Sequence, residues 1–180
     1  MKIIGFAGSN SLDSINKKLV RYVVSLFKST DVSILDLNDF EVALFRKDRE
    51  EESGIPSKIK KFANELASAD LIVVSLAENN GSYNAAFKNI YDWNSRIPNH
   101  KMFQDKPVLL MATSPGQRGG KSVLEDAENH FPRQGANLMG VFSLPNFNDN
   151  FDEEQMKVVD SDKNAELQAL IQKIESDNSF

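Results

Sequence analysis

The amino-acid sequence predicts an α/β fold in which helices cover both faces of a parallel β-sheet. Short apolar runs rich in β-branched residues alternate along the chain with stretches whose apolar residues recur at the helical period. Two of the runs, residues 71–77 and 108–112, are apolar almost throughout, which is typical of strands buried on both faces. Because strand and helix alternate, right-handed crossover connections onto one parallel sheet follow.

Five strands are expected, at residues 3–7, 32–37, 71–77, 108–112 and 138–144. Five helices are expected between and after them, at residues 14–28, 57–69, 84–97, 120–132 and 162–176. The first helix shows the pattern well, because Ile15, Leu19, Val23 and Leu26 recur at close to the helical period. Phe87 and Trp93 of the third helix are expected in the core rather than against a ligand.

Two long, charged segments interrupt this alternation, at residues 38–56 and 145–161. Long connections in compact domains are often functional or mobile. Solvated surface loops are the simpler interpretation, and we adopt it as the prediction for both segments.

The composition excludes several classes of function. A chain of 180 residues fits one domain, here expected to span residues 1–180. A net charge of -5 without a basic patch argues against nucleic-acid binding. The chain has no cysteine, and its two histidines, His100 and His130, have no metal-ligand spacing, so we expect no metal site. No apolar run reaches the roughly 20 residues of a membrane helix, so we expect a cytoplasmic protein without membrane contact.

A loop rich in small polar residues joins the first strand to the first helix. Residues 8–16 have the sequence GSNSLDSIN, in which the hydroxyls of Ser9, Ser11 and Ser14 can donate hydrogen bonds. A helix N-terminus also favours an anion. The spacing matches neither the dinucleotide fingerprint nor the Walker A loop. Two interpretations stay open: a cradle for a phosphate monoester that is bound but not transferred, and a plain turn in which Ser11, Asp13 or Ser14 caps the helix.

Two further loops are expected at the same edge of the sheet, where ligands of open α/β sheets bind. Residues 78–83, ENNGSY, follow the third strand, and residues 113–120, TSPGQRGG, follow the fourth. Glycines in both loops let backbone amides approach a flat heterocycle. Asn80 and Ser82 add polar groups at its edge, whereas Arg118 is either an anion or cofactor contact or a solvated surface charge.

The sequence resembles the NADPH-dependent FMN reductase family, which includes quinone, chromate and azo-dye reductases. The resemblance covers nearly the whole chain and rests on three segments, GSNSLDSIN, DLIVVSLAENNGSYNAAFKNIYDW and SPGQRGG. It implies a flavodoxin-like three-layer sandwich with strand order 2-1-3-4-5, usually assembled as a homodimer or homotetramer. It also implies FMN as the cofactor and NADPH or NADH as the reductant.

By this resemblance, the three loops hold the cofactor. The FMN phosphate is expected at Ser9, Ser11, Ser14 and Asn16, with Ile15 between them. The ribityl chain and the isoalloxazine ring are expected beside the other two loops. The cofactor-binding residues expected there are Glu78, Asn79, Asn80, Gly81, Ser82, Ser114, Pro115, Gly116, Gln117, Arg118, Gly119 and Gly120.

Two positions depart from the family pattern. Ser11 stands where the family often has an arginine, so only a hydroxyl is available to the phosphate there. In the middle motif, which often reads Pro-Glu-Tyr-Asn, Ala77 and Asn79 replace the proline and the tyrosine. Because a charge-assisted hydrogen bond is roughly twice as strong as a neutral one, we expect weaker FMN binding.

The resemblance implies an FMN-dependent NAD(P)H oxidoreductase that passes hydride through the flavin to a quinone, azo dye, chromate or similar small-molecule acceptor. The flavin carries such chemistry, so no catalytic side chain is expected, in agreement with the absence of a plausible triad. Two alternatives stay open: a flavodoxin-like electron carrier, and an interaction module that keeps the fold without binding flavin.

Overall fold

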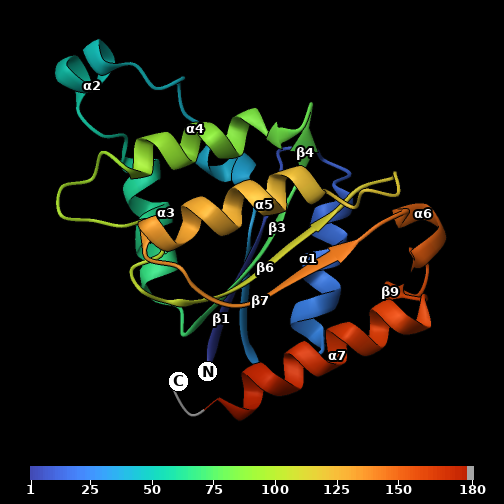
Figure 1. The fold of residues 1–180 in the computed structure, drawn as a ribbon. Coiled ribbons are helices and arrows are strands. Elements are labelled where there is room, and N and C mark those ends of the chain that lie inside the picture. Colours follow the sequence, from blue (N-terminus) through green and yellow to red (C-terminus); the bar gives the residue numbers. More distant parts are fainter. Residues whose placement is uncertain (178–180) are drawn as a thin grey trace.

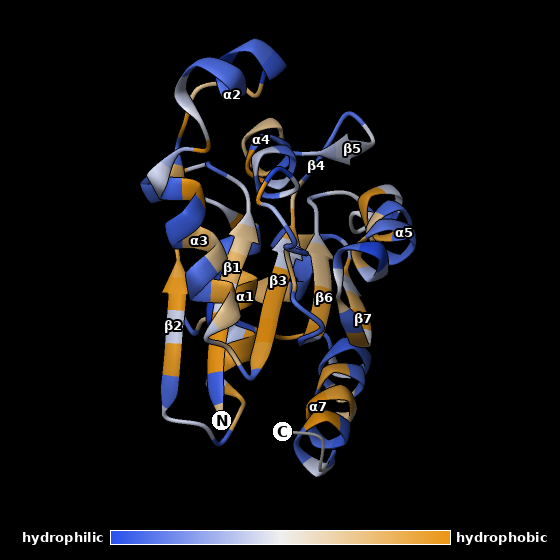
Figure 2. Cartoon of the chain, turned by 90° about the vertical axis from the view of Figure 1, so that its left-hand side faces the viewer, coloured by the Kyte–Doolittle hydropathy of each residue, from blue (hydrophilic) through white to orange (hydrophobic). Residues whose placement is uncertain are grey.

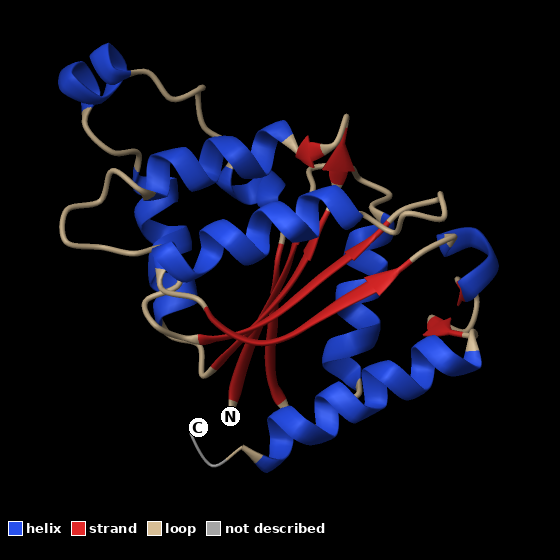
Figure 3. Cartoon of the chain, viewed as in Figure 1, coloured by secondary structure: helices blue, strands red, loops and turns tan. Residues whose placement is uncertain are grey.

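A five-stranded parallel sheet with helices on both faces forms the centre of the computed structural model, which describes residues 1–177 (Figures 1 and 3). The sheet consists of β1 (Lys2–Gly8), β2 (Asp31–Leu35), β3 (Leu71–Leu76), β6 (Pro107–Thr113) and β7 (Asn137–Leu144). Its order is β2-β1-β3-β6-β7, and every neighbouring pair is parallel. Counted among the strands of this sheet alone, the order is 2-1-3-4-5, so the predicted flavodoxin-like fold is confirmed.

The five predicted helices all form, with ends that differ by a few residues from the expected ones. They are α1 (Ile15–Ser25), α3 (Ser57–Ala67), α4 (Ala85–Asn94), α5 (Lys121–His130) and α7 (Ser161–Ser176). Helices α1 and α7 cover one face of the sheet, and α3, α4 and α5 cover the other (Figure 1). Pro132 lies in a short 3-10 turn, η2 (Phe131–Gln134), directly after α5.

The two segments expected to be solvated loops contain short elements. These are η1 (Leu37–Phe40), α2 (Lys47–Ser53), α6 (Phe147–Asn150), β8 (Phe151–Asp152) and β9 (Lys157–Val158). The prediction holds for α2, which has no buried residue and projects from the body of the protein (Figure 1). It is wrong for η1 and for the segment from α6 to β9, because Phe40, Phe147 and Phe151 are buried and anchor the chain there.

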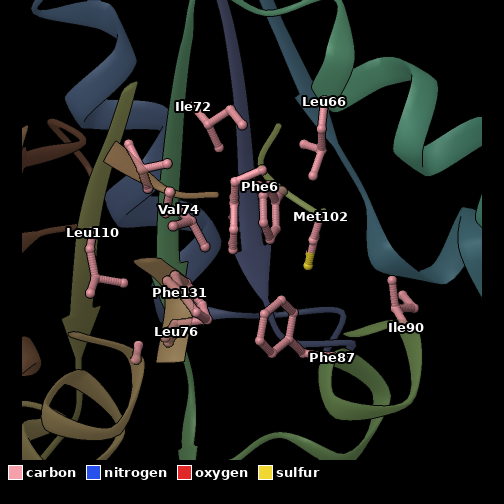
Figure 4. Packing of buried hydrophobic residues seen from close by; sticks show 14 of the residues in the cluster. Phe6, Leu66, Ile72, Val74, Leu76, Phe87, Ile90, Met102, Leu110 and Phe131 are labelled. Carbon is pink, nitrogen blue, oxygen red and sulfur yellow. The ribbon is translucent and has the colours of Figure 1, made fainter. Parts of the chain in front are cut away.

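One buried cluster packs on each face of the sheet. Alternate residues of a strand point to opposite faces, so Ile4 and Phe6 of β1 belong to the cluster under α3, α4 and α5, whereas Ile3 belongs to the cluster under α1 and α7. Phe87 and Trp93 are fully buried, which confirms their predicted place in the core. Figure 4 shows Phe87 beside Phe6 in this packing, and Figure 2 shows the apolar strands enclosed by helices with polar outer faces.

The strand order fixes where a ligand can enter. From β1 the chain crosses to β2 on one side, and then returns to β3 on the other side, so the connections diverge between β1 and β3. Ligands of open α/β sheets bind outside the carboxyl ends of the strands at such a switch point. The segments that follow β1, β3 and β6 all leave the sheet at this edge, near the small hairpin β4 (Glu78–Asn79) and β5 (Ser82–Tyr83) (Figure 2).

Candidate functional site: a hydroxyl-lined hollow at the sheet edge

The loop between β1 and α1 is held in a tight turn by two of its serine hydroxyls. The Oγ of Ser9 accepts a hydrogen bond from the backbone N–H of Ser11 at 3.2 Å. Ser14 is the N-cap of α1, and its Oγ accepts from the backbone N–H of Lys17 at 3.3 Å. A hydroxyl that accepts one bond still has its own hydrogen to donate. The capping role of Ser14 is therefore compatible with a second bond to an anion.

A hollow of about 160 Å³ opens above this loop. The residues that line it come from the segments after β1, β3 and β6: Ser9, Ser11, Asp13, Ser14, Ile15, Asn16, Ala77, Glu78, Thr113, Ser114 and Pro115. This volume is smaller than the roughly 300–1,000 Å³ of sites that enclose a whole small-molecule ligand, so the hollow can take only the phosphate end of a mononucleotide. The rest of such a ligand would extend along the sheet edge.

Asn16 lies at the bottom of the hollow, and its side chain is engaged within the protein. Its Oδ1 accepts from the hydroxyl of Ser75 at 2.7 Å and from the backbone N–H of Thr113 at 3.1 Å, and its Nδ2 donates to the carbonyl of Thr113 at 3.3 Å. The hydroxyl of Thr113 in turn donates to the carbonyl of Leu144 at 2.6 Å. This buried network joins the first turn of α1 to the ends of β3, β6 and β7.

Glu78 connects two of the three loops. Its Oε2 accepts from the backbone N–H groups of Ser122 at 2.9 Å and Val123 at 3.2 Å, at the N-terminus of α5. The N-cap position of α5 is occupied by Gly120, which has no side chain to satisfy those groups. A carboxylate is also the favoured charge at a helix N-terminus. Glu78, in the loop after β3, therefore caps α5. The same bonds hold the first residue of the β4–β5 hairpin in place.

The two glycines that end the loop after β6 are required by close packing. Both have positive φ, 57° for Gly119 and 78° for Gly120. A Cβ at Gly119 would lie 2.3 Å from the Oγ of Ser143, and one at Gly120 would lie 2.6 Å from the Cβ of Ala112. The loop is thereby held against β6 and β7. Gly116, by contrast, has open space around it, so its backbone is accessible to a ligand.

The remaining predicted residues surround the hollow without lining it. Asn79, Asn80, Gly81 and Ser82 are exposed on the β4–β5 hairpin, and Gly116, Gln117 and Arg118 are exposed on the loop after β6. The guanidinium of Arg118 donates to the hydroxyl of Ser122 at 2.6 Å. The three loops thus meet at one edge, as predicted, but only eight of the seventeen predicted residues line the hollow itself: Ser9, Ser11, Ser14, Ile15, Asn16, Glu78, Ser114 and Pro115.

Sequence reasoning missed three lining residues, Asp13, Ala77 and Thr113. Asp13 was considered only as a helix cap, although it lies inside the predicted loop. Ala77 was expected as the last residue of the third strand, but β3 ends at Leu76, so Ala77 belongs to the loop that follows it. Thr113 was expected in the loop of residues 113–120 without a cofactor-binding role, and it is the last residue of β6.

Neither histidine lines the hollow. The Nε2 of His100 lies 2.9 Å from the Oδ1 of Asn94, and burial lowers the pKa of His100 below its ordinary value. His130 is exposed and lies beside Asp126 on α5. Within residues 1–177, no group of three or more His, Asp or Glu side chains is placed to hold a metal ion. None of the helices in this range is both long and apolar enough to cross a membrane.

The parallel sheet and its switch point define a flavodoxin-like fold, with a hydroxyl-lined hollow at the N-terminus of α1, the edge where such sheets bind ligands. Residues 1–149 match the NADPH-dependent FMN reductase family, and the chain belongs to this family. The resemblance that the sequence motifs indicated is therefore confirmed.

Three known proteins illustrate what the chain is similar to. The chain is 28% identical over 148 residues to an uncharacterized protein of Mycoplasma pneumoniae, covering 80% of this chain and 87% of that protein. It is 29% identical over 121 residues to a quinone reductase of Escherichia coli, covering 67% of this chain and 63% of the reductase, which is slightly under two thirds of its length. A solved structure with the same fold is the flavoenzyme NAD(P)H:(acceptor) oxidoreductase of Paracoccus denitrificans, with a TM-score of 0.74, 21% identity and 97% of both chains covered.

Proposed function

We propose that this protein is an FMN-dependent NAD(P)H oxidoreductase that reduces a quinone or a similar small acceptor. The observation that carries the proposal is the hollow at the switch point, lined by the hydroxyls of Ser9, Ser11 and Ser14 in a chain of the FMN reductase family. The quinone reductase relatives support a quinone as the acceptor. Azo dyes and chromate are further candidate acceptors.

The donor set of the hollow fits the phosphate of FMN. Its serine hydroxyls can donate hydrogen bonds, and the first backbone N–H groups of α1, at Ile15 and Asn16, point out of the helix end without an intrahelical partner. The positive end of the helix dipole adds a favourable field for an anion. The hollow has room for the phosphate, and the exposed backbone near Gly81 and Gly116 leaves a flat ring system free to lie along the edge.

Bound FMN would supply the redox chemistry, taking a hydride from NAD(P)H and giving two electrons to the acceptor. The protein residues then bind and orient. Asn16 and Glu78 hold the loops in position through their internal hydrogen bonds, and the serines with the α1 amides hold the phosphate. We propose no catalytic side chain, because hydride transfer between two bound ring systems needs none.

We further propose that the protein works in the cytoplasm, where NAD(P)H is available, as a homodimer or homotetramer. Sedimentation equilibrium of the purified protein tests the assembly. A homodimer or larger homo-oligomer is the expected result, and a monomer at micromolar concentration would contradict it.

Steady-state kinetics test the function. Purified protein supplied with FMN should oxidise NADPH or NADH in the presence of a benzoquinone. The reciprocal plots should be parallel, as for an enzyme that releases the oxidised nicotinamide before it binds the acceptor. Ser14→Ala should raise the FMN concentration needed for half-maximal activity about tenfold, because one phosphate hydrogen bond and the helix cap are both lost.

The matched control is Ser68→Ala, which removes an exposed serine hydroxyl at the C-terminal end of α3. This variant should behave like the natural protein. No NAD(P)H oxidation with any acceptor at saturating FMN would reject the proposed activity.

A further inference from the structure

The hollow proposed to hold the FMN phosphate has an unusual charge. Among the residues that line it, two are carboxylates, Asp13 and Glu78, and none is a cation. Glu78 is committed to the N-terminus of α5, where its Oε2 accepts two backbone hydrogen bonds. Asp13 has no such role, and its side chain is 85% exposed on the loop.

The cations closest to the loop in sequence are both paired with carboxylates. The Nζ of Lys18 lies 2.6 Å from the Oδ1 of Asp13 and 2.7 Å from the Oε2 of Glu153, in the turn between β8 and β9. Lys17 forms an ion pair with Asp36 instead. The hydrogen bonds from Lys18 to Asp13 and then to Glu153 raise the pKa of Lys18, so its ammonium group stays charged.

We propose that Asp13 is a specificity-determining residue whose negative charge weakens the binding of the flavin phosphate. Lys18 and Glu153 determine how strong this repulsion is. The site then distinguishes FMN from riboflavin less sharply than its hydroxyls and helix end alone would allow. This inference rests on the proposed function, since it assumes that flavin occupies the hollow. Its consequence is a flavin that exchanges with the solution instead of staying bound through purification.

The physical argument is a balance of charges around one dianion. A phosphate monoester carries a charge of about -1.5 to -2 at neutral pH. The carboxylate of Asp13 repels it, and the ammonium of Lys18 offsets that repulsion in part. Glu153 competes with Asp13 for the same ammonium and so reduces the offset. Asp13 and Glu153 therefore weaken the binding of the phosphate, and Lys18 strengthens it.

Fluorescence titration of FMN and riboflavin tests the proposal. Asp13→Asn should tighten FMN binding about two- to fivefold, the effect of one unit charge several ångströms away in a water-like medium. Glu153→Gln should tighten it by less, and Lys18→Gln should weaken it. The dissociation constant for riboflavin, which has no phosphate, should stay unchanged in all three variants. The gain in Asp13→Asn should shrink as salt is added, because salt screens exposed charges.

The control variant is Glu128→Gln, which removes one exposed carboxylate from α5 outside the hollow. It should leave both dissociation constants unchanged. Equal effects of Asp13→Asn on FMN and riboflavin, or no effect on FMN, would overturn this inference while leaving the flavin site intact. Failure of the natural protein to bind either flavin would instead overturn the proposed function and this inference with it.

Discussion

Replacing Asn16 by alanine should destabilise the protein more than any change to the exposed part of the loop. The Asn16 side chain makes three buried hydrogen bonds, with the hydroxyl of Ser75 and with the backbone N–H and carbonyl of Thr113. Alanine at position 16 removes all three and leaves buried groups at the ends of β3 and β6 without that partner. No other side chain on α1 connects to these strand ends through such bonds.

The size of the effect follows from these contacts. Each buried hydrogen bond contributes about 0.5–1.5 kcal/mol, so the loss in the free energy of unfolding should be about 3 kcal/mol. In a protein of this size, that loss corresponds to a decrease in Tm of about 6–12 °C. Ser75→Ala should cost only about 1 kcal/mol, because the Oδ1 of Asn16 keeps its bond from Thr113.

Urea unfolding followed by circular dichroism measures both values. Asn129→Ala is the matched control, because this asparagine is exposed on α5 and bonds only to a carbonyl of its own helix. Its unfolding free energy should change by no more than about 0.5 kcal/mol. A loss of less than about 1 kcal/mol for Asn16→Ala would refute the view that this network holds the loop in place.

Two other predictions concern the loop after β6 and the tyrosines. Gly120→Ala should cost about 2–4 kcal/mol in urea unfolding, because the new Cβ lies 2.6 Å from that of Ala112 at a positive φ; an unchanged midpoint would contradict this. Burial raises the pKa of all three tyrosines, Tyr22, Tyr83 and Tyr91, above the ordinary value of 10. The pKa of Tyr91 rises to about 12. Because the protonated phenol is favoured in the folded state, these tyrosines contribute fully to the free energy of unfolding below pH 10. That contribution is lost as the pH rises through the pKa values of the folded protein. In an alkaline titration, phenolate absorbance should therefore appear at higher pH in the native protein than in the protein unfolded by guanidinium chloride. Coincident titration curves would contradict the burial of these tyrosines.

The sequence was sufficient to predict the sheet because its strands are buried on both faces. β3 and β6 form near-continuous apolar runs, and such runs have few other stable arrangements between amphipathic helices. The short elements of the long connections were not predictable in this way. The rings of Phe147 and Phe151 stack with their centroids 4.7 Å apart and are buried in the cluster under α1 and α7. This segment therefore depends on contacts that local periodicity does not encode.

The site was predictable in outline, because the three loops follow strands whose order fixes their common edge. The internal partners of its residues were not predictable. Asn16 bonds to Thr113, 97 residues away along the chain, and Glu78 caps a helix 44 residues away. Such pairings are visible only in the folded structure, and they indicate that these two side chains position the loops. The direct contacts proposed for the phosphate are the hydroxyls and the α1 amides.

The reductase activity is tested most directly by anaerobic mixing of the FMN-loaded protein with NADPH or NADH while the visible flavin absorbance is recorded. The absorbance of protein-bound FMN should be lost rapidly and should return when a quinone is added. Bound FMN that stays oxidised with both reductants would contradict the reductase assignment and favour an electron carrier. Absence of any FMN binding, even in the Asp13→Asn variant, would contradict the flavin site itself.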